Sequence, residues 1–143
     1  MKRKNKNGFT LVELLISMSI IAVLAVVLTA SFSNAQKNGR DQRRIADLKA
    51  IQNAAEQMVL LSGTYPTTSG WYLATSPAWS VAGQVVLAKV PGDPKGGNYV
   101  NYGVTNSSYC VCAVMEAKKN SNAENTQCSF ANSDGYFCVK NQQ

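Results

Sequence analysis

The first 33 residues constrain the fold more than any other part of the chain. A basic leader, MKRKNKNG, ends at Gly8, and an apolar segment begins at Phe9 with a single carboxylate, Glu13, near its start. From Leu14 to Phe32 the chain carries no charge, and a helix of that length, at about 1.5 Å per residue, approaches the thickness of a hydrocarbon core. We therefore expect a membrane-spanning helix over residues 9–33.

The charges of the leader, residues 1–8, predict the orientation of this span. Lys2, Arg3, Lys4 and Lys6 are expected to stay cytoplasmic, so the chain beyond the span should face outward. A secretory signal has a shorter apolar region, with a small-residue cleavage site on its far side. Here the small residue beside a polar stretch is Gly8, in front of the span. Cleavage there would leave the span on the mature protein.

The run GFTLVELL resembles the N-terminal motif of the type IV filament superfamily, which comprises the pilins and the pseudopilins of type II secretion. The resemblance implies that a prepilin peptidase cuts between Gly8 and Phe9 and methylates the new amine of Phe9. It also implies that Glu13 pairs with that amine on a neighbouring subunit, which would offset the cost of a carboxylate within the membrane. The alternative is that Glu13 lies near the membrane interface and needs no partner.

An amphipathic pattern continues the helix beyond the span. Apolar residues recur at spacings of three and four, opposite polar and charged positions. They are Ile45, Leu48, Ile51, Ala55, Met58 and Val59. Gly63 is a good helix terminator, and Pro66 prevents the helix from resuming. We expect one helix from Thr10 to about Ser62, whose second half packs on an outward-facing domain of residues 34–143.

The rest of the chain reads as loops and short strands. Tyr65, Trp71, Tyr72 and Trp79 lie in a loop segment and are expected to cover the helix end rather than form a ligand platform. A short apolar run follows at residues 85–90. Strands are predicted around Tyr99 and Tyr102, in YCVCAV and in YFCVK, with a hairpin tip near Ser133 and Asp134. This predicts an α+β fold, a long helix on a small antiparallel sheet. YPTT and the glycine turn before YVNYG also resemble the core of the major pseudopilin.

Four cysteines in an outward-facing domain predict two disulfides, because that compartment favours oxidation. Cys110 and Cys112 share one face of a strand, at a separation near the upper limit for a bridge between them. We therefore favour a pairing of each with one of Cys128 and Cys138. The alternatives are a zinc site and a redox-active C-x-C, of which zinc is disfavoured by the absence of histidine.

Charge and composition limit the functional classes. The formal charge of +6 minus the four leader charges leaves +2, a weak basis for nucleic-acid binding. A basic cluster beyond the span is expected to be a solvated or lipid-facing collar; it comprises Lys37, Arg40, Arg43, Arg44 and Lys49. No histidine, paired-carboxylate site or phosphate-binding glycine loop is present, so we expect no catalysis.

The resemblance also raises the question of calcium, which major pseudopilins commonly bind through acidic residues of the C-terminal loop. Glu116, Glu124 and Asp134 are the acidic candidates, with Asn120, Asn122 and Asn132 as further oxygen donors. Calcium needs several carboxylates close together, whereas these are widely spaced in sequence. We expect no cofactor.

The favoured function is a structural subunit of a type IV pilus or a type II secretion-like pseudopilus, anchored in the inner membrane and then assembled into an extracellular or periplasmic filament. Its partners would be other copies of itself, other pilin-like subunits, the prepilin peptidase, a membrane assembly platform and membrane lipid. The alternative is a minor pilin-like binding module, an adhesin or a DNA-uptake receptor, at the membrane or the filament tip. The sequence leaves open which machine takes up the subunit.

Overall fold

The computed structural model describes residues 8–66 and 78–142. The chain divides into two compact units, one ending at Gln36 and the other beginning at Lys37. Helix α1 (Leu11–Ser62) supplies residues to both units and spans 52 residues. The long N-terminal helix that the sequence predicts is therefore confirmed.

The end of α1 has a local cause. Gly63 adopts a positive φ of 78°, and its N–H donates to the Val59 carbonyl oxygen at 2.7 Å. The Ser62 hydroxyl donates to the Met58 carbonyl oxygen at 2.7 Å. A left-handed residue after the last turn is the usual way to satisfy the last carbonyls of a helix, and glycine adopts it without strain.

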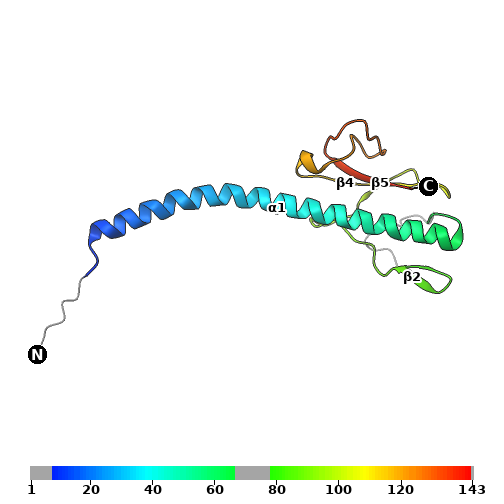
Figure 1. The fold of residues 1–143 in the computed structure, drawn as a ribbon, viewed down its shortest axis with the longest axis horizontal. Helices are drawn as coiled ribbons and strands as arrows, with labels where there is room; N and C mark the ends of the chain where they lie inside the picture. The colour runs from blue at the N-terminus through cyan, green and yellow to red at the C-terminus, as the bar shows by residue number, and fades with distance from the viewer. Residues whose placement is uncertain (1–7, 67–77, 143) are drawn as a thin grey trace, which may run out of the picture. The chain divides into compact units, whose positions relative to one another are not determined.

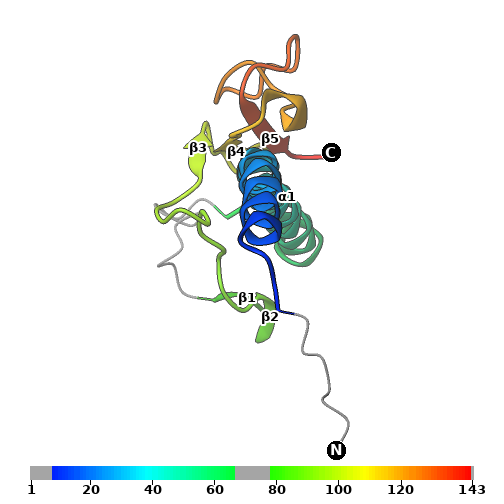
Figure 2. The same cartoon turned by 90° about the vertical axis from the view of Figure 1, so that its left-hand side faces the viewer.

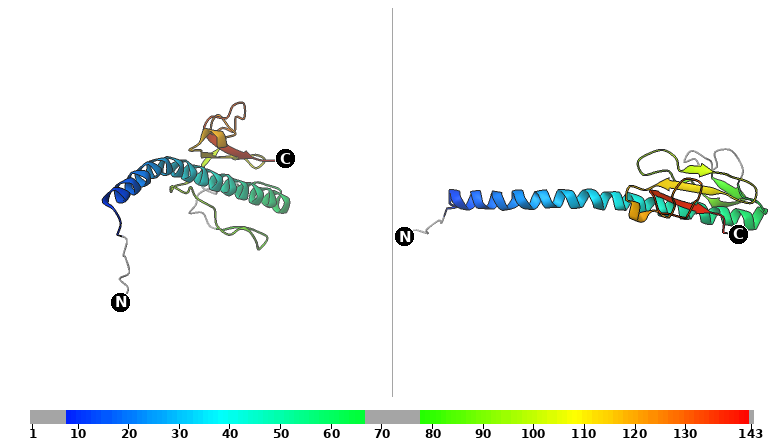
Figure 3. Two further views of the ribbon diagram at one scale, coloured as in Figure 1. Left: turned by 60° about the vertical axis from the view of Figure 1, so that its left-hand side comes forward. Right: turned by 90° about the horizontal axis from the view of Figure 1, so that it is seen from above.

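In the second unit, a three-stranded antiparallel sheet covers one side of α1 (Figures 1 and 3). Its order is β3 (Val100–Tyr102), β4 (Cys110–Val114) and β5 (Tyr136–Lys140). Val111 pairs with Val139, and Cys112 pairs with Cys138. Because side chains alternate along a strand, the valine pair faces the main core and the cysteine pair faces the other way.

The main core fills the space between α1 and this sheet. Leu48, Ile51 and Ala55 of the helix are fully buried against Val111 of β4 and Val90 of the loop before β3. Burial of an aliphatic side chain stabilises a domain by about 1.5–3 kcal/mol. The amphipathic half of α1 therefore packs as its periodicity predicts.

A second, smaller core lies on the opposite face of the sheet. It contains Cys110, Cys112, Cys138 and Ala123, and it is covered by the β4–β5 connection. This connection includes a short 3₁₀ turn, η1 (Lys118–Asn120), and a β-bridge between Ala123 and Tyr136. The domain is thus layered as helix, sheet and loop.

The predicted hairpin ending near Ser133 and Asp134 is wrong, although its last strand, β5, is confirmed. β5 pairs with β4 instead of with the nearby CSF segment, which forms no strand. Cys128 in that segment has a positive φ of 55° and is bonded to Cys110. A left-handed residue interrupts the extended backbone, so the segment cannot continue a ladder.

A second sheet, which the sequence analysis did not predict, joins the end of the predicted loop to the apolar run at residues 85–90. β1 (Trp79–Val81) and β2 (Gln84–Leu87) form an antiparallel hairpin. Ala82 and Gly83 connect them with positive φ values of 49° and 81°, as a two-residue type I′ turn requires. The hairpin lies on a different side of α1 from β4 and β5 (Figure 2).

Candidate functional site

The motif residues at the start of α1 form a capping box. Thr10 precedes the helix, and its backbone N–H and hydroxyl donate to Oε2 of Glu13 at 2.9 and 2.7 Å. In return, the Glu13 N–H donates to the Thr10 hydroxyl oxygen at 3.3 Å. This reciprocal arrangement satisfies N–H groups that the first turn of a helix leaves unpaired. Glu13 is therefore held at the helix start by its own chain.

The apolar part of α1 is uncovered within its unit. Leu11, Leu15, Ile21 and Val26 are 64–82% exposed, and the 18-residue window of greatest hydropathy has no buried residue. By length and composition this one helix could cross a membrane. An uncovered apolar surface of this extent needs lipid or protein around it. We call residues 9–32 the stem.

Just beyond the boundary between the units, α1 carries a cluster of ion pairs. Arg44 is 3% exposed and donates to Asp93 through Nε and Nη2 at 2.6 and 3.0 Å. Arg40 makes a two-pronged contact with Glu116, both bonds at 2.7 Å. Lys95 approaches Glu116 to 2.9 Å. Bidentate arginine–carboxylate contacts fix geometry as well as charge, so these side chains tie two distant loops to the helix.

Asp41 occupies the centre of this ionic cluster and is fully buried. Its carboxylate accepts from the backbone N–H groups of Glu116 and Ala117, both at 2.9 Å. It also accepts from Arg44 Nη1 at 2.9 Å and from the Asn120 side-chain amide at 3.1 Å. With four donors around one buried carboxylate, the cost of its desolvation is offset, and the start of the β4–β5 connection is anchored on α1.

The ionic cluster lowers the pKa of three of its carboxyl groups. The Arg44 guanidinium lowers the pKa of Asp93, against the opposing effect of burial. Burial acts to raise the pKa of Asp41, but the hydrogen bonds from Glu116, Asn120, Ala117 and Arg44 together lower it. The pKa of Glu116 falls well below its usual range, chiefly because of the hydrogen bonds from Arg40. All three carboxyls are therefore ionised at neutral pH.

The prediction that five basic residues form a solvated or lipid-facing collar is wrong for two of them. Arg40 and Arg44 face carboxylates of their own domain instead of lipid or solvent. Lys37, Arg43 and Lys49 are exposed. This division reduces the positive surface available for an anionic partner to three side chains on α1.

Two further carboxylates of α1 accept tyrosine hydroxyls. Glu56 accepts from Tyr65 at 3.0 Å, and Asp47 accepts from Tyr99 at 2.7 Å. Burial, together with the hydrogen bond to Glu56, raises the pKa of Tyr65 to about 12. Tyr65 and Trp79 are buried, in agreement with their predicted packing role, while Trp71 and Tyr72 lie outside the described residues.

The four cysteines are joined in two disulfides, Cys110–Cys128 and Cys112–Cys138. This is one of the two connectivities that the sequence favoured. The four sulfur atoms lie within 4.8 Å of one another. Carbonyl oxygens surround them: Thr126 O is 3.4 Å from Cys110 Sγ, and Asn125 O is 3.4 Å from Cys138 Sγ. Oxygen lone pairs repel the thiolates that zinc requires, so the surroundings suit neutral sulfur.

Comparison with known proteins identifies the motif and the domain. The family model described as the prokaryotic N-terminal methylation motif matches residues 3–29. The chain is 26% identical over 106 residues to the type II secretion system core protein G of Klebsiella michiganensis, covering 69% of this chain and 75% of that protein. It is 28% identical over 102 residues to the protein of that name from Escherichia coli K12, covering 66% and 70%. The chain thus carries the prepilin-type methylation motif and is similar to pseudopilins of type II secretion over a further part of its length.

A third relative of this pilin-like protein, the type II secretion system core protein G of Vibrio cholerae serotype O1, is 26% identical over 106 residues, which cover 68% of this chain and 71% of the relative. No solved structure matches the chain. The matched lengths extend well past the methylation motif, so the resemblance includes the domain as well as the stem.

Two of the three acidic calcium candidates of this pilin-like protein are paired with basic side chains. Glu116 is engaged by Arg40, Arg44 and Lys95, and Asp134 is paired with Lys118. Among the described residues, the four cysteines are the one group of three or more metal-ligating side chains close enough to hold an ion. Asn122 donates to the Cys138 carbonyl oxygen and accepts from its N–H, so it serves as a strand partner for β5. Among the described carboxylates, no group of three lies close enough together to hold one ion, and the expectation on calcium stays a prediction.

Sequence reasoning missed the ionic cluster of this pilin-like protein. Neither Asp41 nor Asp93 was predicted to form an ion pair, and the loop partners of Asp41 and Arg44 lie 49 to 79 residues away along the chain. The available signal was the phase of Asp41 and Arg44, which lie on the same helix face as Leu48 and Ile51. Charged residues in phase with a buried stripe indicate partners from elsewhere in the fold.

Proposed function

We propose that this chain is a structural filament subunit that is cut between Gly8 and Phe9 and assembles through its stem. The observation that carries the proposal is the combination at the N-terminus: a basic leader, the GFTLVE motif and an uncovered apolar helix that continues into a folded domain. A cut in front of the stem would retain it in the mature protein, as assembly requires.

Before assembly, the stem would be stored in the membrane with the leader on the cytoplasmic side. On assembly, the stems of successive copies would pack against one another and replace lipid. Contacts of this kind are head-to-tail and generate a helical filament when the rotation does not close. The role is structural, and the partners are other pilin-like subunits, a prepilin peptidase and a membrane assembly platform.

We assign Glu13 the central role in this assembly. The Thr10 capping box fixes the Glu13 carboxylate at the start of the stem, and both bonds that it accepts there end on Oε2. A carboxylate in this position can also receive the amine of Phe9 from a neighbouring subunit, which would neutralise both charges within the apolar core.

The names of the relatives favour a secretion pseudopilus over a pilus. The test is intact-mass analysis of filaments sheared from the cells, together with electron microscopy. We expect this chain as a dominant component, beginning at an N-methylated Phe9, and loss of protein secretion when its gene is deleted. A chain that retains residues 1–8, or one absent from sheared filaments, would contradict the proposal.

A further inference from the structure

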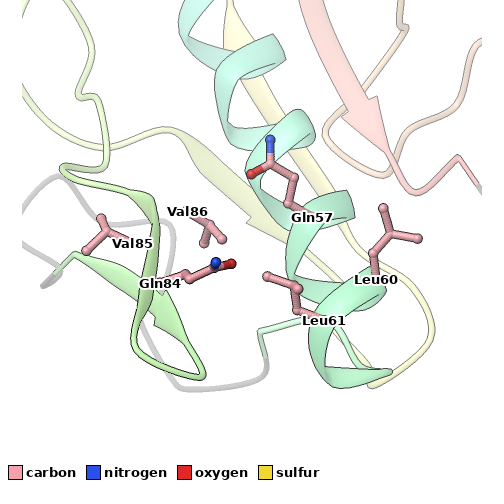
Figure 4. A pocket seen from close by; sticks show the side chains of 6 residues that line it. All are labelled: Gln57, Leu60, Leu61, Gln84, Val85 and Val86. Atoms are coloured by element: carbon pink, nitrogen blue, oxygen red, sulfur yellow. The ribbon is translucent and has the colours of Figure 1, made fainter.

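An apolar groove in the second unit has no occupant among the described residues. One wall is the end of α1, with Leu60 and Leu61, and the other is the hairpin strand β2, with Val85 and Val86 (Figure 4). Gln57 and Gln84 also line the groove, which encloses about 550 Å³. Leu60 is 77% exposed and Val85 is 62% exposed, so the groove exposes apolar surface that a soluble domain normally covers.

The helix face that leads to the groove is uncharged and begins with two small residues. Ala46, Ala50, Asn53 and Gln57 follow one another at spacings of three and four and are all exposed. The same spacing leads on to Leu60 and Leu61. Small side chains along such a line allow a second helix to approach closely. Lys49 flanks this line but does not line the groove.

The chemistry of the groove selects an uncharged apolar helix as its occupant. None of its six lining residues carries a charge, and the stem from Leu14 to Phe32 carries none either. The stem is also the largest uncovered apolar surface of the described chain. Stem and groove belong to one continuous helix, α1, so a stem that enters the groove comes from another copy.

We propose that the groove between the end of α1 and the β1–β2 hairpin is the seat of the stem of a second copy in the assembled filament. The proposal rests on the proposed function, since it assumes that copies assemble. It goes further by giving the folded domain a direct share in covering the stem, through Leu60, Leu61 and Val85.

The first test places a photo-crosslinking amino acid at position 60 of the full chain, within filaments assembled from a mixture of isotopically light and heavy subunits. We expect mixed-isotope links to the tryptic peptide that ends at Lys37, which contains the stem. Links to residues 67–77 of the same chain, to lipid or to a different protein would overturn the proposal, as would the absence of any link.

The second test uses a matched pair of substitutions. Val85→Asp introduces a carboxylate into the groove, while Val114→Asp introduces one at a similarly exposed valine, 55% exposed, on β4 and outside the groove. Because an unpaired charge is costly to bury, we expect incorporation of Val85→Asp beside wild type to fall about tenfold or more, and that of Val114→Asp to stay near normal. Both should accumulate in the membrane with their disulfides intact.

The outcomes separate the two proposals. Equal incorporation of the two variants would refute the groove assignment and leave the structural-subunit function standing. Failure of the wild-type chain to enter any filament would refute both. A Val85→Asp variant that does not accumulate is replaced by Val85→Gln, for which we expect a smaller loss in the same direction; normal incorporation of that variant counts against the groove.

Discussion

At the scale of single residues, Asp41 is the position where most of the long-range order of the domain converges. Its buried carboxylate joins the helix to the backbone of Glu116 and Ala117 and to Arg44. A buried ion pair adds little stability relative to an apolar pair of the same shape, but removal of one partner leaves an uncompensated charge. Replacement of Asp41 should therefore destabilise the domain chiefly because it leaves the buried charge of Arg44 without this partner.

We expect Asp41→Asn to lower the free energy of unfolding of the domain by about 3 kcal/mol, because Arg44 stays buried without its neighbour and two backbone N–H groups compete for one amide oxygen. The measurement is urea unfolding of a soluble fragment that begins at Asn34. The control is Asp134→Asn, since Asp134 and Lys118 are both exposed and their pair should contribute little. Equal midpoints for the two variants would contradict this assignment.

Acidification should act through the same cluster. Asp41, Asp93 and Glu116 have a lower pKa in the folded domain than in the unfolded chain, where carboxyl values lie near 4. The unfolded chain therefore binds more protons as the pH falls, so the stabilisation is present above about pH 4 and is lost as the pH falls towards the folded values. Unfolding curves at several pH values should show this fall, with a shallower slope for Glu116→Gln. An unchanged slope in that variant would argue against the cluster.

At the scale of elements, the β4–β5 connection is held on the sheet by covalent bonds in place of a large core. Cys110–Cys128 closes a separation of 18 residues and Cys112–Cys138 one of 26. Beneath the loop lies a small core of few side chains. Cross-links of this kind stabilise chiefly by restricting the unfolded chain, more so for longer loops.

Each disulfide should therefore contribute about 3 kcal/mol to the free energy of unfolding. The measurement compares Cys110→Ser with Cys128→Ser in one double variant and Cys112→Ser with Cys138→Ser in another. The native fragment should contain no free thiol and weigh less than its reduced form by four hydrogen atoms. Reductant should lower its melting temperature, whereas chelators should not. The reverse response would favour a metal site at the four cysteines over two disulfides.

The sequence was sufficient for elements whose cause is local. The boundaries of α1 follow from Thr10, Glu13 and Gly63, and the last strand follows from its β-branched and aromatic residues. The β1–β2 hairpin was missed because its turn, Ala82–Gly83, lacks the asparagine or aspartate that usually marks a type I′ turn. The ionic cluster was missed because its partners meet only in the folded domain.

At the scale of the whole molecule, the chain contains one well-buried domain and one helix segment that nothing in its own unit covers. Such a molecule is incomplete alone. Lipid supplies the cover in one state and other copies supply it in the next, so the same apolar surface serves both storage and assembly. In the proposed assembly, the carboxylate of Glu13 would be unpaired in lipid and paired in the filament.

We expect Glu13→Leu to enter the membrane at least as well as wild type but to join filaments poorly, because it removes the carboxylate that we propose to pair with the Phe9 amine of a neighbouring subunit. The measurement is the variant's share in sheared filaments of cells that also express wild type. Ser17→Ala is the control, since the Ser17 hydroxyl donates to the backbone oxygen of Glu13 within the same helix. Normal incorporation of Glu13→Leu would show that no such neutralisation is needed.

The covalent attachment of the β4–β5 connection also affects how this protein can diverge. The two disulfides and the Asp41 contacts fix the position of the connection, while the tip at residues 131–133 is exposed. Mutations at that tip should therefore have little effect on folding. The surface at this tip can therefore change in sequence while the architecture beneath it stays the same.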